Sequence, residues 1–158
     1  MAKVNNTRMF ANYDGDFVVF LIGMRINSFW KINKWWPVAM AMPRMLRELF
    51  TNKESGFLGG HSWFGRTTIM LQYWKSFDHL EAYAKDKTGE HFPAWKEFNQ
   101  KVRKSNAAGV WHESYKVSKG TYENIYVNMP SFGLGKAGKL IPVSEKYEYA
   151  KQRLIHQN

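Results

Sequence analysis

The chain has 158 residues, a length typical of one domain, and a formal net charge of +10. It contains no cysteine, which excludes disulfide bonds, thiolate catalysis and cysteine-ligated metals. Its aromatic fraction of 16% is high and favours pockets and interfaces as well as a core. The cations form no run of five, so we interpret them as a solvated surface and expect no nucleic-acid partner.

The N-terminal segment, residues 1–16, is polar and predicts an arm that docks through Met9, Phe10 and Tyr13. It lacks the apolar stretch of a secretory signal. The longest apolar run, Phe17–Met24, is too short to span a bilayer. With the absence of cysteine, these features favour a cytoplasmic protein without a membrane partner.

The β-branched and aromatic run Phe17–Ile26 predicts a strand that is apolar on both faces. Such a strand needs helices on one side and a second sheet or a partner subunit on the other. Gly23 permits a bulge or a close backbone approach. Arg25 ends the strand, where it is either a surface charge or a group that points into a cavity.

Between Lys31 and Phe50, apolar residues recur at helical spacing. Pro37 suits a first turn, whereas Pro43 would kink a helix interior. We therefore expect a helix that begins near Trp36, or two pieces broken before Pro43. We interpret its stripe of methionine and tryptophan as core and not as a cofactor site.

Two β-like runs, Phe57–Phe64 and Thr67–Trp74, predict a hairpin. The pair Gly59-Gly60 in the first run suggests a bulge or a close approach to a ligand. His61 is either a hydrogen-bonded strand residue or a pocket group. Ser76 follows as a helix N-cap.

His91 opens an apolar helical stripe that includes Trp95. It is either a hydrogen-bonded residue at a helix start, or a pocket acid/base or axial haem ligand. In the following predicted strand, residues 107–117, successive side chains point to opposite faces of the sheet. This places His112 and Ser114 on one face, and Trp111, Glu113, Tyr115 and Val117 on the other.

The order β-α-β-β-α-β is the plan of a ferredoxin-like α+β sandwich over residues 17–128. Residues 129–158 are expected to form a C-terminal extension, either an arm with a weak helical pattern or a disordered segment. Because the second face of the sheet is still apolar, we expect a homodimer that closes two sheets into a dimeric α/β barrel.

Residues 67–99, with the segments YWKSFDHLEAYA and HFPAW, resemble the signature of the dimeric α/β-barrel superfamily. That superfamily includes antibiotic-biosynthesis-type monooxygenases and haem-degrading or haem-dependent enzymes. The segments GVWHESY, GTYENIYVNMP and GLG, within residues 109–135, are similar to a monooxygenase-like family that includes a fumagillin-pathway protein. The resemblance spans about residues 17–138. It implies an oxidoreductase, monooxygenase-like, that acts on a small apolar or aromatic molecule.

Members of the wider superfamily oxidise aromatic substrates without metal or flavin, which requires an apolar pocket, a base and O2. Candidates for the base are His91 and His112, together with Glu113 if burial raises its pKa. The candidate substrate-binding residues are Arg25, His61, Trp74, Trp95, Trp111 and Tyr115.

Two other functions remain open. A haem enzyme resembling aldoxime dehydratases or haem-degrading proteins would use His91 or His112 as the axial ligand. A non-catalytic protein would use the same pocket to bind a small apolar ligand. No metal site is expected from the spacing, although His61 and Glu113 could join the two histidines as ligands if their elements converged.

Overall fold

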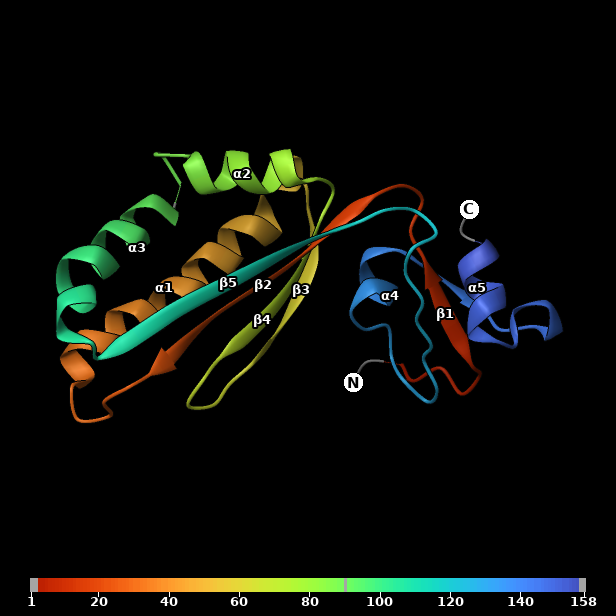
Figure 1. Ribbon diagram of the computed structural model, residues 1–158, viewed down its shortest axis with the longest axis horizontal. Helices are drawn as coiled ribbons and strands as arrows, with labels where there is room; N and C mark the ends of the chain where they lie inside the picture. Colours follow the sequence, from red (N-terminus) through yellow and green to blue (C-terminus); the bar gives the residue numbers. More distant parts are fainter. Residues whose placement is uncertain (1–2, 90, 157–158) are drawn as a thin grey trace.

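The computed structural model describes residues 3–89 and 91–156. A four-stranded antiparallel sheet has the order β3-β4-β2-β5. Its strands are β2 (Phe17–Ile26), β3 (Phe57–Trp63), β4 (Ile69–Trp74) and β5 (Ala108–Val117). With its helices this is the ferredoxin-like sandwich, so the predicted fold class is confirmed (Figure 1).

The central strand β2 has the predicted bounds and pairs with β5 along its whole length, from Phe17 opposite Val117 to Ile26 opposite Ala108. Its pairing with β4 is shorter and ends at Ile22, which lies opposite Met70. Beyond that pair, β2 has a regular ladder on the β5 side alone. The predicted bulge in β3 is confirmed by a register shift between Phe57 and Gly59.

Three helices cover one face of the sheet: α1 (Ile32–Thr51), α2 (Phe77–Lys85) and α3 (His91–Glu97) (Figure 1). A π-helical turn, Phe98–Val102, extends α3. The predicted N-cap of α2 is confirmed, because Ser76 Oγ accepts a hydrogen bond from the His79 backbone N–H at 3.3 Å. None of the described helices combines the length and the apolar character needed to cross a bilayer.

Of the two alternatives for α1, the break before Pro43 is wrong, since one continuous helix contains both Pro37 and Pro43. The helix also begins earlier than the other alternative expects, at Ile32 and not near Trp36. A proline inside a helix costs about 3 kcal/mol because it lacks an N–H and crowds the preceding turn. Burial of apolar side chains on the inward face of α1 offsets that cost. Leu49 is buried against Val18, Trp74 and Leu80.

The core between helices and sheet is divided into two clusters. Val18 lies in the first cluster, near the start of β2. Met24 and Ile26 lie in the second, near its end, together with Val102 and Ala108. The segment between the clusters, Phe20 to Ile22, is only partly buried, so the helix-facing side of β2 is left incompletely packed at its middle.

The two ends of the chain form a second, smaller unit beside the sandwich (Figure 1). Strand β1 (Met9–Asn12) pairs with β6 (Lys139–Pro142), and the helices α4 (Leu134–Ala137) and α5 (Ala150–His156) flank them. Phe10 is fully buried, as expected of a docked arm. The extended run expected at 122–127 joins β1 through an isolated bridge between Met9 and Tyr126. The Asn124 side chain adds two hydrogen bonds to the backbone of Ala11, at 2.6 and 2.9 Å.

Phe17 and Leu134 form a third buried cluster with Ala11, which joins this unit to the sandwich. Tyr73 of β4 packs against the cluster. Burial and the neighbouring Tyr126 raise the pKa of Tyr73 to about 12. A side chain of the sheet is therefore enclosed by residues from the C-terminal part of the chain.

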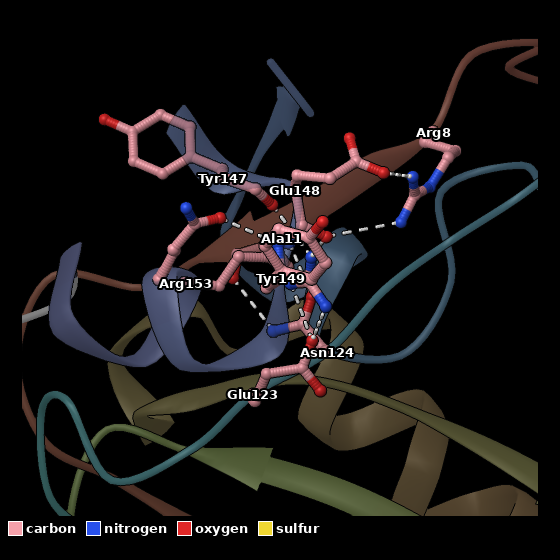
Figure 2. A network of polar contacts seen from close by, with 9 residues as sticks. Arg8, Ala11, Glu123, Asn124, Tyr147, Glu148, Tyr149 and Arg153 are labelled. Atoms are coloured by element: carbon pink, nitrogen blue, oxygen red, sulfur yellow. Dashed lines mark hydrogen bonds and ion pairs between the residues drawn. The ribbon is translucent and has the colours of Figure 1, made fainter. Parts of the chain in front are cut away.

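A buried arginine fixes the last helix (Figure 2). Arg153 Nε donates to Glu123 Oε1 at 2.7 Å, and Arg153 Nη1 donates to the carbonyls of Tyr147 and Glu148, each at 2.8 Å. The Arg153 side chain is 6% exposed. The ion pair between Arg8 and Glu148 is far more exposed.

We expect Glu123→Ala to lower the free energy of unfolding by about 3 kcal/mol, because the buried guanidinium loses its anion. Arg8→Ala is the matched control in the same unit and should cost less than about 1 kcal/mol. Urea unfolding followed by circular dichroism measures both. Equal losses in the two variants would contradict a special role for Arg153.

Candidate functional site

A cavity of about 590 Å³ lies where the core is divided. Its walls come from the inward face of α1, the middle of β2, the β3–β4 hairpin, α2, α3 and β5. This volume is in the range of about 300–1,000 Å³ that holds small ligands. Local sequence explains the gap, because Ala39 and Ala41 of α1 are too small to fill the space above the sheet.

The walls are mostly apolar and contain many adaptable side chains. Met24, Met42, Met45 and Met70 all line the cavity, and methionine fits irregular apolar ligands. The stripe on α1 that the sequence predicts as core is therefore divided. Leu49 is core, whereas Met42 and Met45 face the cavity.

Few polar side chains reach the walls: Ser62, Thr68, Glu81, His112 and Ser114. His112 and Ser114 come from the β5 face that the alternation predicts. His112 also stacks at an angle of 44° on Phe20, with ring centroids 5.7 Å apart. Ser114 was missed as a candidate, although its shared face with His112 is a signal that could have identified it.

Trp111 lines the cavity, but strand alternation puts its indole ring on the outward side of β5, over Gly23. Its indole Nε1 has no hydrogen-bond partner among the described residues. A buried N–H without a partner costs about 1–3 kcal/mol.

Gly23 makes the position of Trp111 attainable. The two residues are directly opposite in the β2–β5 register. A Cβ atom on Gly23 would lie 2.7 Å from Trp111 Nε1 and 2.0 Å from the Thr68 carbonyl oxygen. The close approach predicted for Gly23 is thus observed, and it involves both neighbouring strands.

Two of the candidate substrate-binding residues, Trp95 and Trp111, line the cavity, together with the candidate base His112. The other described candidates lie elsewhere. Trp74 is buried in the core, where its Nε1 donates to Gln72 Oε1 at 2.8 Å. Arg25 is exposed and donates to Thr67 Oγ1 at 3.1 Å. The side chain of His91 lies outside the described part of the chain.

The remaining candidates lie on the outward face of the sheet. Glu113 is exposed and not buried as its proposed role requires. Its Oε2 accepts a hydrogen bond from Tyr115 Oη at 2.6 Å, and this bond raises the pKa of Tyr115. His61 packs edge-to-face on Trp63 and Phe132, with centroid distances of 4.6 and 4.8 Å. Strand alternation explains these placements, because odd positions of β5 point away from the helices.

Within the described residues, no group of three histidine, aspartate or glutamate side chains is placed to hold a metal ion. The polar groups at the cavity are instead suited to small organic ligands. His112 can accept or donate a proton, and Ser114 can donate a hydrogen bond.

Gly23→Ala should lower the free energy of unfolding by about 3 kcal/mol or more, because its new methyl group meets the backbone of Thr68. Gly109→Ala in β5 is the control, since its nearest non-neighbouring atom would be 3.8 Å away. That change should stay within about 0.5 kcal/mol. Similar unfolding midpoints for both variants would show that the approach at Gly23 is not tight.

Comparison with known proteins adds a family and a set of similar folds. Residues 17–134 match the family described as monooxygenase af470-like. No curated protein matches the chain. Among solved structures, SnoaB, a cofactor-independent oxygenase from Streptomyces nogalater, is 10% identical with a TM-score of 0.45. The alignment covers 63% of this chain and 91% of SnoaB.

A dimeric protein of unknown function with a ferredoxin-like fold, from Bacteroides fragilis, is 12% identical with a TM-score of 0.46. The alignment covers 63% of this chain and 95% of that one. The family match includes every strand of the sandwich and all the described residues of the cavity wall. This chain belongs to the monooxygenase af470-like family.

Proposed function

We propose that the protein is a monooxygenase-type oxidoreductase that acts on a small apolar or aromatic molecule bound in the cavity between sheet and helices. One observation carries the proposal beyond family membership. A large apolar cavity contains one proton-transfer group, His112, with the Ser114 hydroxyl on the same face of β5.

The two groups fit different steps of an oxygenation that needs no cofactor. His112 takes a proton from an activated C–H or O–H bond of the substrate. Ser114, on the same face of β5, donates a hydrogen bond to the oxygen on which the anion's charge collects. The anion supplies electrons to O2, and a C–O bond forms to give a peroxide. Loss of water from the peroxide leaves one oxygen atom in the product.

The apolar walls support this chemistry in two ways. They bind a flat hydrophobic substrate through methionine and aromatic side chains, and they limit the access of water to the anion. Trp95 and Phe98 bring α3 to the cavity, so the helix opened by His91 forms part of the same wall.

His112→Ala should reduce turnover of an aromatic test substrate such as an anthrone by at least about 100-fold, with stability unchanged because His112 is exposed. Ser114→Ala removes the hydroxyl donor beside His112, and should reduce kcat about 10- to 100-fold. Oxygen consumption and product absorbance provide the measurement. Glu113→Gln, on the other face, is the matched control and should retain full activity. Unchanged rates in both cavity variants would refute the assignment.

The haem alternative depends on the same histidine. His112 is the described histidine at the cavity wall and would be the axial ligand of a bound haem. A Soret absorbance band in the protein reconstituted with haem, lost in His112→Ala, would favour this alternative over the cofactor-independent reaction.

We also propose that two copies pair through the outward face of the sheet. Leu21, Leu71 and Ile69 are only partly buried there, and Trp63 and Tyr115 are exposed. A symmetric dimer would cover these side chains and form the barrel.

Leu71→Arg should convert the dimer to a monomer, because a desolvated charge would lie in the interface. Ile32→Arg places the same charge on the outer side of α1 and should leave the dimer intact. Sedimentation velocity distinguishes the two states. A wild-type monomer at all concentrations would contradict the pairing.

A further inference from the structure

A second apolar surface lies away from the open face of the sheet. Phe29 and Trp30 project from the loop after β2, and Trp30 is 95% exposed. The exposed side chains Ile32, Trp36 and Met40 follow on α1. Because they are four residues apart, they lie along one side of the helix. We call these five residues the apolar patch.

The loop at the centre of the patch is held in place. The backbone N–H groups of Asn27 and Ser28 donate to the Ala107 carbonyl, at 2.9 and 3.2 Å. Trp35 Nε1 donates to the Phe29 carbonyl at 3.1 Å. Trp30 is therefore presented to the outside by an ordered loop, so its exposure is part of the fold.

Neither the core nor the proposed dimer covers the patch. The opposite side of α1 faces the cavity through Val38, Met42 and Met45. The helix is therefore apolar on both sides, a pattern typical of helices with a second contact surface. The helices cover one face of the sheet, and pairing of two sheets uses the other face (Figure 1).

The charged residues in the stretch of sequence that carries the patch are all of one sign. From Phe17 to Arg47 the sequence contains no aspartate or glutamate, whereas Lys31 and Lys34 lie among the aromatic residues. Cations at a helix N-terminus oppose the helix dipole, and the first turn of α1 has no acidic residue to compensate. Lys31 is accounted for within the chain, because its Nζ donates to the Ser105 carbonyl at 3.2 Å. An external anionic surface would account for Lys34.

We propose that the apolar patch docks on the surface of an anionic lipid bilayer. Tryptophans beside lysines are typical of protein surfaces that lie at the interface between headgroups and acyl chains. Trp30 and Trp36 insert at headgroup level, and Lys34 contacts the anionic headgroups. The absence of a spanning segment, from which we expected no membrane partner, does not bear on a contact of this kind.

The patch adjoins one opening of the cavity. Phe64, at the tip of the β3–β4 hairpin, lines the cavity and is 85% exposed. The hairpin tip is tied to the loop, since the Arg66 guanidinium lies 5.7 Å from the centre of the Phe29 ring and the Ile26 N–H donates to the Arg66 carbonyl. A lipophilic substrate could pass from the bilayer to the cavity, a consequence that rests on the proposed function. The docking itself does not depend on the proposed function.

Co-sedimentation of the full chain with vesicles tests the docking. We expect binding to phosphatidylcholine mixed with phosphatidylserine, and weaker binding to phosphatidylcholine alone or at high salt. The double variant Trp30→Ser/Trp36→Ser should lower the partition coefficient by about tenfold or more, because it removes the inserted rings. Lys34→Glu should lower it about tenfold on anionic vesicles alone.

Matched controls come from the other end of the molecule. Tyr149→Ser removes an exposed aromatic ring, and Lys139→Glu reverses an exposed charge, and both should bind vesicles as the wild type does. Circular dichroism checks that each variant is folded.

Three outcomes would overturn the proposal. The first is an absence of wild-type binding to anionic vesicles. The second is a change of the double variant's oligomeric state in sedimentation velocity, which would identify the patch as an interface between copies. The third is binding to duplex DNA that exceeds vesicle binding and is lost in Lys34→Glu. None of these outcomes depends on turnover, so failure of the proposed activity would be seen separately.

Discussion

The pairing of β2 with β5 over ten residues is the constraint on which the rest of the structure depends. It holds the central strand in register after its pairing with β4 has ended at Ile22. The same register places Trp111 opposite Gly23 and His112 opposite Ile22. A shift by one residue would exchange the two faces of β5 and would move His112 away from the helices.

The apolar residues of the chain serve more than its core. Two separate clusters hold the helices to the sheet at the ends of β2, and the space between them is left as a cavity. Ala39 and Ala41 are too small to close it, and the methionines around it can adapt to a guest. The high aromatic content is likewise divided among core, cavity wall, open sheet face and the exposed edge at Trp30.

The ends of the chain cooperate in a way that neither end indicates alone. Residues of β1 find their strand partner in β6, about 130 positions away, and the buried Arg153 holds α5 to Glu123. Strands of four residues are marginal by themselves. Their stability here comes from the buried contacts of Phe10, Phe17 and Leu134 with neighbouring residues.

The sequence by itself determined the sandwich, because strand alternation and helical periodicity are local signals read along one element at a time. It thereby placed His112 and Ser114 on one face of β5 and Ser76 at a helix start. It left open whether α1 continues through Pro43, since packing against distant residues decides that balance. Nor could it separate Met42 and Met45 in the cavity wall from Leu49 in the core. Those differences depend on how closely separate elements approach, which only the tertiary structure decided.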